Sequence, residues 1–340
     1  MSDLDARILV TGGSGFLGSH FVRAWLMRGG TALMNLDLMT YAGSPERLAD
    51  VDEFHAYGYQ RGDVAEAADV EATVRRFRPD LVVHFAAESH VTRGEREGER
   101  FWRTNVEGTR VMLEKAAAAG VRRFVHVSTD EVYGPCADGS FREEGKLPGA
   151  GLATSAYAKS KAVADDLARD LVGDMEVVVL RPTNCFGPWQ FPEKAFARWV
   201  ARALSGSPVP VWGDGLYVRQ WLFAEDLARA VILLLKAEDT DRVYNVGPRH
   251  DPEITNLDLA RWLLGYLGLP EDRLVLTTYD RPEHDRRYAV DPSRIEALGW
   301  RPGHVWERLA STVEWYRANE SWWRPLMEQA ESIYADGEPA

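Results

Sequence analysis

Arg7-Ile-Leu-Val-Thr11, followed directly by Gly12-Gly-Ser-Gly-Phe-Leu-Gly18, is the stretch that decides the fold of this 340-residue chain. The apolar run predicts a buried strand, and the residues from about 15 to 28 predict a helix directly after it. Glycines at such a junction let the backbone approach a pyrophosphate, and the free N–H groups of a helix N-terminus attract the same group. The stretch therefore predicts a dinucleotide site at the first turn of a Rossmann-type sheet.

Strands and helices alternate beyond this junction. Further strands are predicted at 31–37, 54–60, 81–84, 123–128 and 176–181, and helices at 66–78, 100–119 and 157–171. Such alternation implies a parallel sheet with right-handed crossovers. The remaining chain is richer in Pro, Trp and Arg, with helices predicted near 194–204, 225–236, 256–267 and 304–317. The predicted fold is α/β: a doubly wound parallel sheet with a smaller C-terminal mixed α/β domain.

The predicted domain boundary lies at Arg181-Pro182. The first domain spans 1–182, and segments around 221–245 are expected to return to it. The second domain spans 183–335.

The amino-acid composition limits the classes of protein and partner that fit this chain. A hydrophobic content of 45% is that of a globular protein, and no apolar run approaches the roughly 20 residues of a membrane helix. The polar, acidic N-terminus predicts no signal peptide. The two cysteines, Cys136 and Cys185, lack metal-ligand spacing, which predicts no metal site and a reducing cytoplasm. The net charge of −12 argues against nucleic acid as a partner.

Asp37 decides the type of dinucleotide. It ends the second predicted strand, 19 residues after Gly18. A carboxylate there accepts hydrogen bonds from ribose hydroxyls and repels a 2′-phosphate, which favours NAD over NADP. The competing interpretation is a glycine-rich turn followed by an incidental Asp. Asp63-Val64, after the third strand, could bound the adenine, although alone the pair reads as a turn.

Two motifs carry the chemistry: Ser128-Thr129-Asp130-Glu131 and Tyr157-Ala-Lys-Ser-Lys161. A Tyr/Lys pair can deprotonate a sugar hydroxyl while a nicotinamide takes the hydride. Two further carboxyl groups, one as acid and one as base, are what eliminating water from the same sugar requires. Read alone, the first motif is an ordinary turn or helix cap, and the second is common on helix surfaces.

The chain resembles the extended short-chain dehydrogenase/reductases, and within them the nucleotide-sugar 4,6-dehydratases. Gly12, Gly15 and Gly18 have the wider glycine spacing of that superfamily, in addition to Tyr157 and Lys161. The resemblance covers nearly the whole chain. Its further motifs are Leu36-Asp-Leu-Met-Thr-Tyr-Ala-Gly43, Phe85-Ala-Ala-Glu-Ser-His-Val91, Thr104-Asn-Val-Glu-Gly-Thr109, Ser128-Thr-Asp-Glu-Val-Tyr-Gly134, Phe191-Pro-Glu-Lys194, Trp212-Gly-Asp-Gly215, Asp280-Arg-Pro-Glu-His-Asp-Arg-Arg-Tyr288 and Leu298-Gly-Trp-Arg-Pro302.

The resemblance implies a lyase of deoxysugar biosynthesis, with dTDP-glucose as the first substrate to expect. Tyr157 would take the proton of the 4-hydroxyl, its pKa lowered by Lys161 and the nicotinamide charge, while Thr129 hydrogen-bonds the oxygen and NAD takes the C4 hydride. Glu131 would remove the C5 proton, Asp130 would protonate the departing 6-hydroxyl, and hydride would return to C6. The product would be a 4-keto-6-deoxy sugar. Residues 183–335 would bind the nucleotide sugar.

The resemblance also implies which residues form each part of the site. The catalytic residues are Thr129, Asp130, Glu131, Tyr157 and Lys161. The cofactor residues are Gly12, Gly15, Phe16, Leu17, Gly18, Asp37, Thr40, Asp63, Val64, Ala86, Ala87, Thr104, Ser128, Tyr157 and Lys161. The substrate residues are Ser89, Asn184, Lys194, Ala195, Pro210, Trp212, Arg219, Asn256, Arg281 and His284. Taken one at a time, an Arg or Lys is more often solvated surface, and a lone Trp is more often core.

Several motifs depart from the family pattern. Thr92-Arg93-Gly94 and Gln220 replace usual residues, and so does Ala195. These positions touch the base and sugar pockets, so another base or sugar is an alternative. A UDP-sugar 4-epimerase or decarboxylase, which needs no Asp130-Glu131 pair, is a second alternative. A silent NAD-binding scaffold is a third. The resemblance further implies a homodimer formed through the helices at 100–119 and 157–171, although apolar faces of helices usually pack within their own chain.

Overall fold

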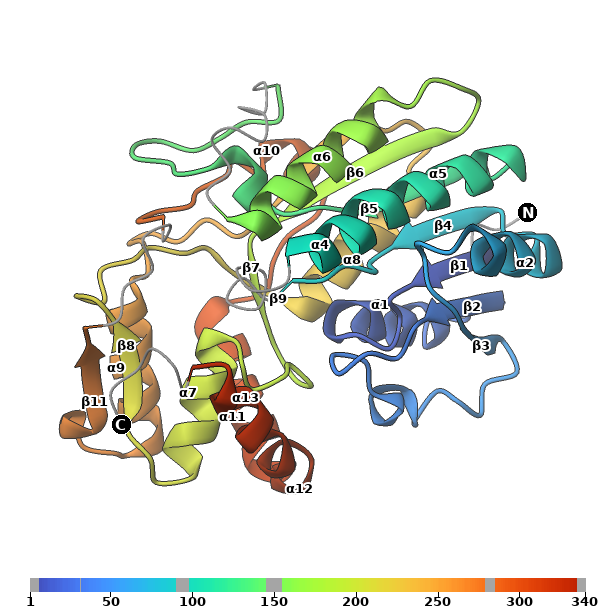
Figure 1. The fold of residues 1–340 in the computed structure, drawn as a ribbon. Coiled ribbons are helices and arrows are strands. Elements are labelled where there is room, and N and C mark those ends of the chain that lie inside the picture. Colours follow the sequence, from blue (N-terminus) through green and yellow to red (C-terminus); the bar gives the residue numbers. More distant parts are fainter. Residues whose placement is uncertain (1–5, 31, 90–97, 145–154, 279–284, 335–340) are drawn as a thin grey trace.

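The computed structural model describes residues 6–30, 32–89, 98–144, 155–278 and 285–334. Its centre is a seven-stranded sheet with the order β10-β6-β5-β4-β1-β2-β3 (Figure 1). Each of its strand pairs is parallel. The strands are β1 Arg7–Thr11, β2 Ala32–Asp37, β3 Tyr57–Arg61, β4 Leu81–His84, β5 Arg123–Val127, β6 Glu176–Pro182 and β10 Val243–Val246. The predicted doubly wound α/β sheet is confirmed.

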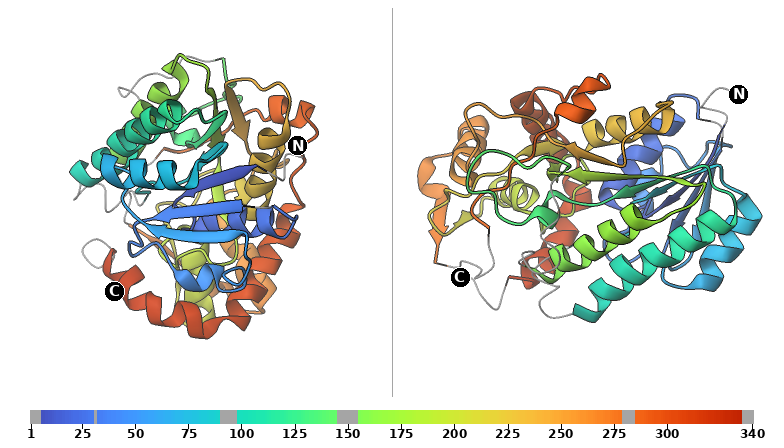
Figure 2. Two further views of the ribbon diagram at one scale, coloured as in Figure 1. Left: turned by 90° about the vertical axis from the view of Figure 1, so that its right-hand side faces the viewer. Right: turned by 90° about the horizontal axis from the view of Figure 1, so that it is seen from above.

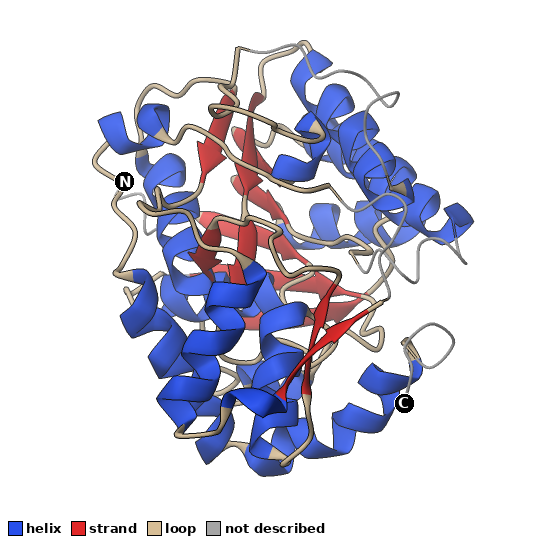
Figure 3. Cartoon of the chain, turned by 90° about the vertical axis from the view of Figure 1, so that its left-hand side faces the viewer, coloured by secondary structure: helices blue, strands red, loops and turns tan. Residues whose placement is uncertain are grey.

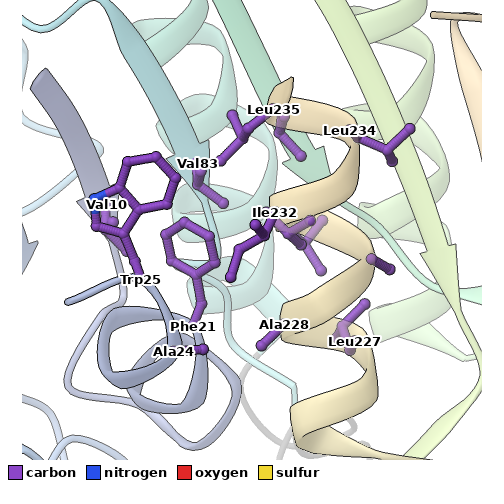
Figure 4. Packing of buried hydrophobic residues seen from close by; sticks show 14 of the residues in the cluster. Val10, Phe21, Ala24, Trp25, Val83, Leu227, Ala228, Ile232, Leu234 and Leu235 are labelled. Carbon is purple, nitrogen blue, oxygen red and sulfur yellow. The ribbon is translucent and has the colours of Figure 1, made fainter. Parts of the chain in front are cut away.

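Helices cover both faces of this sheet (Figure 2). One face carries α1 Phe16–Leu26 and α8 Ala224–Lys236, and the other carries α2 Ala67–Phe77, α5 Gly108–Ala118 and α6 Ala156–Asp170. Alternation along β1 sends Ile8 and Val10 to the first face and Leu9 to the second, and all three side chains are fully buried. Figure 4 shows Phe21 and Trp25 of α1 packed near Ile232 of α8 on the first face.

The predicted helix 100–119 is not uniform. It consists of α4 Gly98–Phe101, a π-helical segment η3 Trp102–Glu107, and α5. Within η3, the buried Asn105 side chain accepts a hydrogen bond from Glu88 N at 2.9 Å and donates to Glu88 O at 3.0 Å. It also donates to Ser160 Oγ of α6 at 2.9 Å. The wider turn thus ties the segment after β4 to α6, and residue periodicity gives no signal for it.

The second half of the chain forms a mainly helical body beside the large sheet (Figure 3). Its main helices are α7 Ala195–Leu204, α9 Asn256–Leu267 and α11 Val305–Ala318. They pack with β8 into a separate core that includes Phe196, Val211 and Leu263. Two parallel strand pairs belong to this half: β7 Asn184–Phe186 with β9 Trp221–Phe223, and β8 Val209–Trp212 with β11 Leu274–Thr277.

The smaller elements complete the chain. They are η2 Pro45–Leu48, η4 Asp130–Tyr133, η5 Glu271–Arg273, α10 Ser293–Ala297, α12 Glu320–Trp323, η6 Arg324–Leu326 and α13 Met327–Ser332. Across the described ranges, no helix combines the length and apolar character that crossing a bilayer would take.

The sheet order reverses between β1 and β4. The connections that follow these two strands leave toward opposite faces, so a crevice opens at their carboxyl ends. Ligands of doubly wound sheets bind at such a reversal.

Candidate active site

A cavity of about 350 Å³ lies at this reversal, and its walls come from both halves of the chain. Its size falls in the range of roughly 300–1,000 Å³ that is typical of small-molecule sites. One wall is formed by the loops after β1, β2, β4 and β5, and the facing wall by residues 182–185, 190–191 and 193–196. The cavity therefore joins the nucleotide-binding edge of the sheet to the helical body.

The glycine loop after β1 has space only for glycine at several positions. Gly12 has a φ of +69°, and a Cβ there would lie 2.7 Å from Ala86 N. A Cβ on Gly18 would lie 2.2 Å from Gly12 O, so only a glycine at position 18 lets α1 pack this closely against the loop. Gly15 is the N-cap of α1 and provides no side-chain cap, so the first N–H groups of the helix stay available for a ligand. This loop fits the pyrophosphate of a dinucleotide.

Asn35 of β2 holds the loop in place. Its side chain is fully buried, accepts a hydrogen bond from Gly13 N at 3.0 Å and donates to Ser14 Oγ at 2.9 Å. A Cβ on Gly13 would lie 2.4 Å from Asn35 Oδ1. The pair explains why a glycine stands at position 13 although Gly13 does not line the cavity.

Asp37 ends β2 and is 8% exposed. One carboxylate oxygen accepts from Ser14 N at 2.9 Å, and the other accepts from Met39 N at 2.8 Å. Burial raises the pKa of Asp37, and these two backbone donors oppose the rise. Each carboxylate oxygen retains a further lone pair, so Asp37 can still accept from ribose hydroxyls.

The structure brings all the residues predicted for the cofactor to the cavity wall. They are Gly12, Gly15, Phe16, Leu17, Gly18, Asp37, Thr40, Asp63, Val64, Ala86, Ala87, Thr104, Ser128, Tyr157 and Lys161. Asp63 is also engaged by Arg103 of η3, which ties the loop after β3 to that segment.

The two adjacent carboxyl groups lie at the start of η4, after β5. Thr129 is the N-cap of η4, and its hydroxyl accepts from Glu131 N at 3.3 Å. Asp130 is 4% exposed, and its Oδ2 has no hydrogen-bond partner within the described residues. Burial, followed by the charge of Glu131, raises the pKa of Asp130 to about 8, and Arg219 opposes this rise. Asp130 therefore keeps a proton at neutral pH and can act as an acid.

Tyr157 and Lys161 project into the same cavity from the first turns of α6. Lys161 is 3% exposed and donates from Nζ to Val127 O of β5 at 2.8 Å. Burial lowers the pKa of Lys161 to about 8, and Asp165, one turn further along α6, opposes this shift. The amine is therefore charged at neutral pH but close to its titration point.

The pKa of Tyr157 differs from the expectation of a lowered value. In the chain without ligands, burial raises it well above the usual range, and the charge of Glu131 adds to the rise. Interaction with the Thr129 hydroxyl lowers it. The chain by itself holds Tyr157 protonated, because a buried phenolate facing carboxylates is unfavourable.

The residues predicted for the substrate divide into three groups. Ser89, Asn184, Lys194 and Ala195 line the cavity, and Lys194 Nζ donates to Ser89 O at 2.7 Å. Pro210, Trp212, Arg219 and Asn256 do not line it. Arg281 and His284 lie outside the described residues.

Local packing explains the second group. Pro210 O accepts from Trp199 Nε1 at 2.6 Å within the helical body, and Trp212 packs edge-on against Tyr334 at 5.9 Å. Asn256 begins α9 and is 8% exposed. Arg219 donates to Asp285 O at 2.8 Å and lies over the Tyr288 ring at 4.5 Å. Its effect on the pKa of Asp130 nevertheless places its charge close to the acid.

Several residues that line the cavity were not predicted. They are Leu36, Leu38, Ala42, Gly43, Arg47, Gly62, Phe85, Glu88, Val127, Pro182, Thr183, Cys185, Gln190, Phe191, Glu193, Phe196 and Trp221. Some, such as Leu36 and Phe191, lie within the motifs quoted above without a role assigned to them, and the others lie outside any motif, so spacing could not single them out. Arg47 and Cys185 are the least expected, because a cation and a thiol both face a buried site.

The NAD-dependent epimerase/dehydratase family model matches residues 8–247. The chain belongs to this family. Curated members similar to it are the dTDP-glucose 4,6-dehydratase of Streptomyces niveus, 41% identical, with 98% of this chain and 99% of the relative covered, and that of Actinoplanes sp., 42% identical, with 93% and 99% covered.

Solved structures of related proteins agree with this family assignment. The crystal structure of the dTDP-glucose 4,6-dehydratase from Streptomyces venezuelae, solved with NAD and a second ligand bound, is 41% identical with a TM-score of 0.88, and 94% of this chain and 99% of that one are covered. A UDP-glucose 4-epimerase from Thermotoga maritima has the same fold at 28% identity, with a TM-score of 0.81 and coverage of 92% and 99%. The likeness to the dehydratases is stronger in both measures.

Proposed function

We propose that this family member catalyses the NAD-dependent 4,6-dehydration of a nucleoside diphosphate sugar, with dTDP-glucose converted to dTDP-4-keto-6-deoxyglucose. The observation that carries the proposal is the buried Asp130, which keeps its proton beside Glu131 in the cavity that also holds Tyr157 and Lys161. Redox chemistry at C4 alone has no use for such an acid, whereas departure of the 6-hydroxyl as water requires one. The named relatives support dTDP-glucose as the substrate.

The residues of the cavity fit NAD. The uncapped N-terminus of α1 and the close-packed glycine loop would hold the pyrophosphate, and Asp37 would accept from the adenosine ribose. Lys161 would contact the nicotinamide ribose. When bound, the nicotinamide supplies the acceptor for the C4 hydride and the donor that returns it to C6.

Tyr157 acts on the 4-hydroxyl. It holds its proton in the chain without ligands, so positive charge contributed on binding must stabilise its phenolate. The charged Lys161 beneath it and the Thr129 hydroxyl beside it favour the same state. Tyr157 then takes the hydroxyl proton as C4 is oxidised, and the resulting 4-ketone acidifies the C5 proton.

Glu131 and Asp130 carry out the elimination. Glu131 takes the C5 proton, the electron pair of that bond forms the C5–C6 double bond, and Asp130 gives its proton to the 6-hydroxyl, which leaves as water. Two adjacent carboxyl groups suit this division because their charges resist ionising together, which keeps one of them protonated.

Paired variants test the division. Asp130→Asn and Glu131→Gln should each lower the turnover of dTDP-glucose by roughly 10²–10⁴-fold, the contribution of a positioned acid or base. Oxidation at C4 should survive, so reduced cofactor accumulates in a single turnover and is detected by its absorbance. Asp138→Asn, in an exposed loop, is the matched control. If both variants form the deoxysugar at the control's rate, the two carboxyl groups have no part in elimination.

We also propose that residues 1–182, with segments around 221–245, form the NAD-binding domain and that residues 183–335 form the nucleotide-sugar domain. Pairing of β10 with β6, and packing of α8 on α1, support the first assignment. A reducing cytoplasm is the proposed compartment, supported by the two free cysteines. Cell fractionation with an antibody against the chain would test that compartment.

A homodimer through the α4–α5 and α6 helices is the remaining part of the proposal. Among the apolar positions of these helices, Val106, Val111 and Leu113 are buried in their own chain. Trp102 of η3, 48% exposed, is the better support for a contact. Trp102→Glu should convert a dimer to a monomer in sedimentation equilibrium, whereas Met27→Glu, which replaces a side chain 60% exposed at the end of α1, should not. A wild-type chain that sediments as a monomer would refute the dimer.

A further inference from the structure

We infer that Arg47 binds a diphosphate group in this cavity, and that this group is the pyrophosphate of the dinucleotide. Arg47 belongs to η2, which follows the loop after Asp37 in sequence, and it is not part of any motif described above. Its side chain is 1% exposed and lines the cavity. The inference deepens the proposed function, because it rests on NAD as the occupant of the glycine loop.

Backbone carbonyls fix the guanidinium from three directions. Nη1 donates to Ser14 O of the glycine loop at 3.0 Å and also to Ala42 O of the loop after β2. Nε donates to Trp189 O, in the loop after β7, at 3.0 Å. These contacts use the N–H groups of Nε and Nη1. Nη2 carries two more, and it has no hydrogen bond to any described residue.

The charge of Arg47 has no carboxylate partner among the residues that the structure describes. No carboxylate in the described part of the chain forms a salt bridge with it. The nearby charges of Asp37 and Glu193 raise its pKa, but burial outweighs them and lowers the pKa to about 10. A buried, unpaired cation is costly to a folded chain. An anion in the cavity would remove that cost, and guanidinium groups favour the oxygens of phosphates.

Position identifies which diphosphate is meant. The contact with Ser14 O puts the guanidinium beside the loop whose glycines and uncapped helix already fit a pyrophosphate. The substrate's own diphosphate is the other source of this chemistry. Its predicted contacts within the described residues, such as Lys194 and Asn184, lie on the facing wall.

Arg47 also links the two walls. Its Trp189 partner has a φ of +65° and packs against Trp315 at 4.8 Å and Trp322 at 5.1 Å. The guanidinium lies over the Trp322 ring at 5.6 Å. The next residue, Gln190, lines the cavity and donates to Cys185 O at 2.9 Å. A pyrophosphate bound to Arg47 would therefore contact the same side chain that fixes the substrate wall.

Binding of ligand fragments tests the inference without turnover. In isothermal titration calorimetry, Arg47→Met should lower the affinity for ADP-ribose, which contains the pyrophosphate, by roughly 10- to 100-fold. This is the loss expected when a charge-assisted hydrogen bond is removed. The affinity for adenosine, which lacks the pyrophosphate, should fall by less than about threefold, and so should the affinity for dTDP. Arg47→Lys keeps the charge and should recover part of the loss, which gives a second reading if the Met variant is poorly folded.

Arg123→Met is the matched control, because Arg123 is equally buried at 3% exposure but starts β5, at the end of the sheet away from the cavity. It should leave all three affinities unchanged. Equal weakening of adenosine and ADP-ribose by Arg47→Met would reduce Arg47 to a loop-packing residue and overturn the inference. A lower affinity for dTDP alone would assign Arg47 to substrate binding, and this result would also overturn the inference. A wild-type chain that binds no ADP-ribose would instead refute the proposed cofactor.

Discussion

At the scale of single residues, burial sets the chemistry of the site more than charge pairing does. Burial is the largest cause of the pKa shifts of Asp130, Tyr157 and Lys161. Its direction differs with charge type: it favours the protonated carboxyl and phenol but the neutral amine. One cavity thus retains an acid on Asp130 while leaving Lys161 close to its titration point.

The pH dependence of turnover follows from these shifts. Asp130 must carry its proton and Lys161 its charge, and both lose a proton as the pH rises through about 8. We expect kcat/KM for dTDP-glucose to fall above that pH, with little change between about pH 6 and 7, because kcat/KM reports the pKa values of the enzyme without substrate. A kcat/KM measured at constant ionic strength that rises through pH 8 would contradict these protonation states.

Stability should also fall with rising pH because of Asp130, but over a lower pH range. The pKa of Asp130 in the folded chain, about 8, exceeds its ordinary value of 3.8, so the folded chain retains a proton that the unfolded chain releases. The free energy of unfolding therefore falls as the pH rises from about 4 to about 8. Asp130→Asn removes this loss and should stabilise the chain by on the order of 1 kcal/mol or more at pH 8, but not at pH 4. Urea denaturation at the two pH values measures the difference.

The sequence alone predicted cavity residues that belong to motifs. The catalytic and cofactor residues, predicted from the two short motifs, the glycine loop and the family resemblance, all line the cavity. Arg47 and Cys185 were not predicted because each belongs to a short element, η2 or β7, outside any motif, and only the tertiary fold brings these elements to the cavity. Trp212 and Arg219 were placed by resemblance, and packing in the helical body keeps them off the cavity wall.

At the scale of elements, a buried ion pair joins the segments that carry the proposed catalytic groups. Arg181 of β6 and Asp165 of α6 are both fully buried and bonded twice, at 2.9 and 2.7 Å. Arg181 also donates to Tyr133 Oη, at the end of η4, at 2.6 Å. Through this pair, α6 with Lys161 and η4 with Asp130 are held to the same strand.

Breaking this pair should be costly. Asp165→Leu alone leaves the buried Arg181 without a carboxylate partner and should lower the free energy of unfolding by about 3–5 kcal/mol. Arg181→Met should cost less, because Asp165 keeps Arg169 at 3.0 Å. The double variant should lose less than the sum, because it leaves neither charge behind. Chemical denaturation of the four proteins completes the cycle. Additive losses would mean that the two side chains do not interact as the structure shows.

The elements themselves were predictable where they are long and regular. The strands of the first half and helices such as α7 and α9 lie within a few residues of their predicted bounds. The strands β7, β8, β9 and β11 have only three or four residues each, too few for a period to appear. The π-helical segment depends on Asn105 reaching Glu88, a contact that no local pattern encodes.

At the scale of the whole molecule, the site exists only between the two halves of the chain. The sheet provides the glycine loop, the acid and the Tyr/Lys pair, whereas residues 182–196 close the opposite wall. The alternation of strands and helices predicted the sheet, but not how the helical body faces it. That relation comes from contacts distant in sequence, such as Arg47 with Trp189 and Tyr316 with Gln190.

This arrangement implies a closed redox cycle, because the hydride taken from C4 is needed again at C6 in the same cavity. The central claim is therefore that the chain turns dTDP-glucose into a 4-keto-6-deoxy sugar with no net consumption of NAD. An epimerase with the same fold would return the hydride to C4 and leave the 6-hydroxyl in place.

Proton NMR of the NAD-supplemented protein with dTDP-glucose in deuterated water tests this most directly. We expect a new C6 methyl signal, with deuterium at C5 and no accumulation of NADH. UDP-glucose in a parallel sample shows whether the base matters. A sugar that is epimerised at C4, or unchanged with both nucleotides, would contradict the roles given to Asp130 and Glu131.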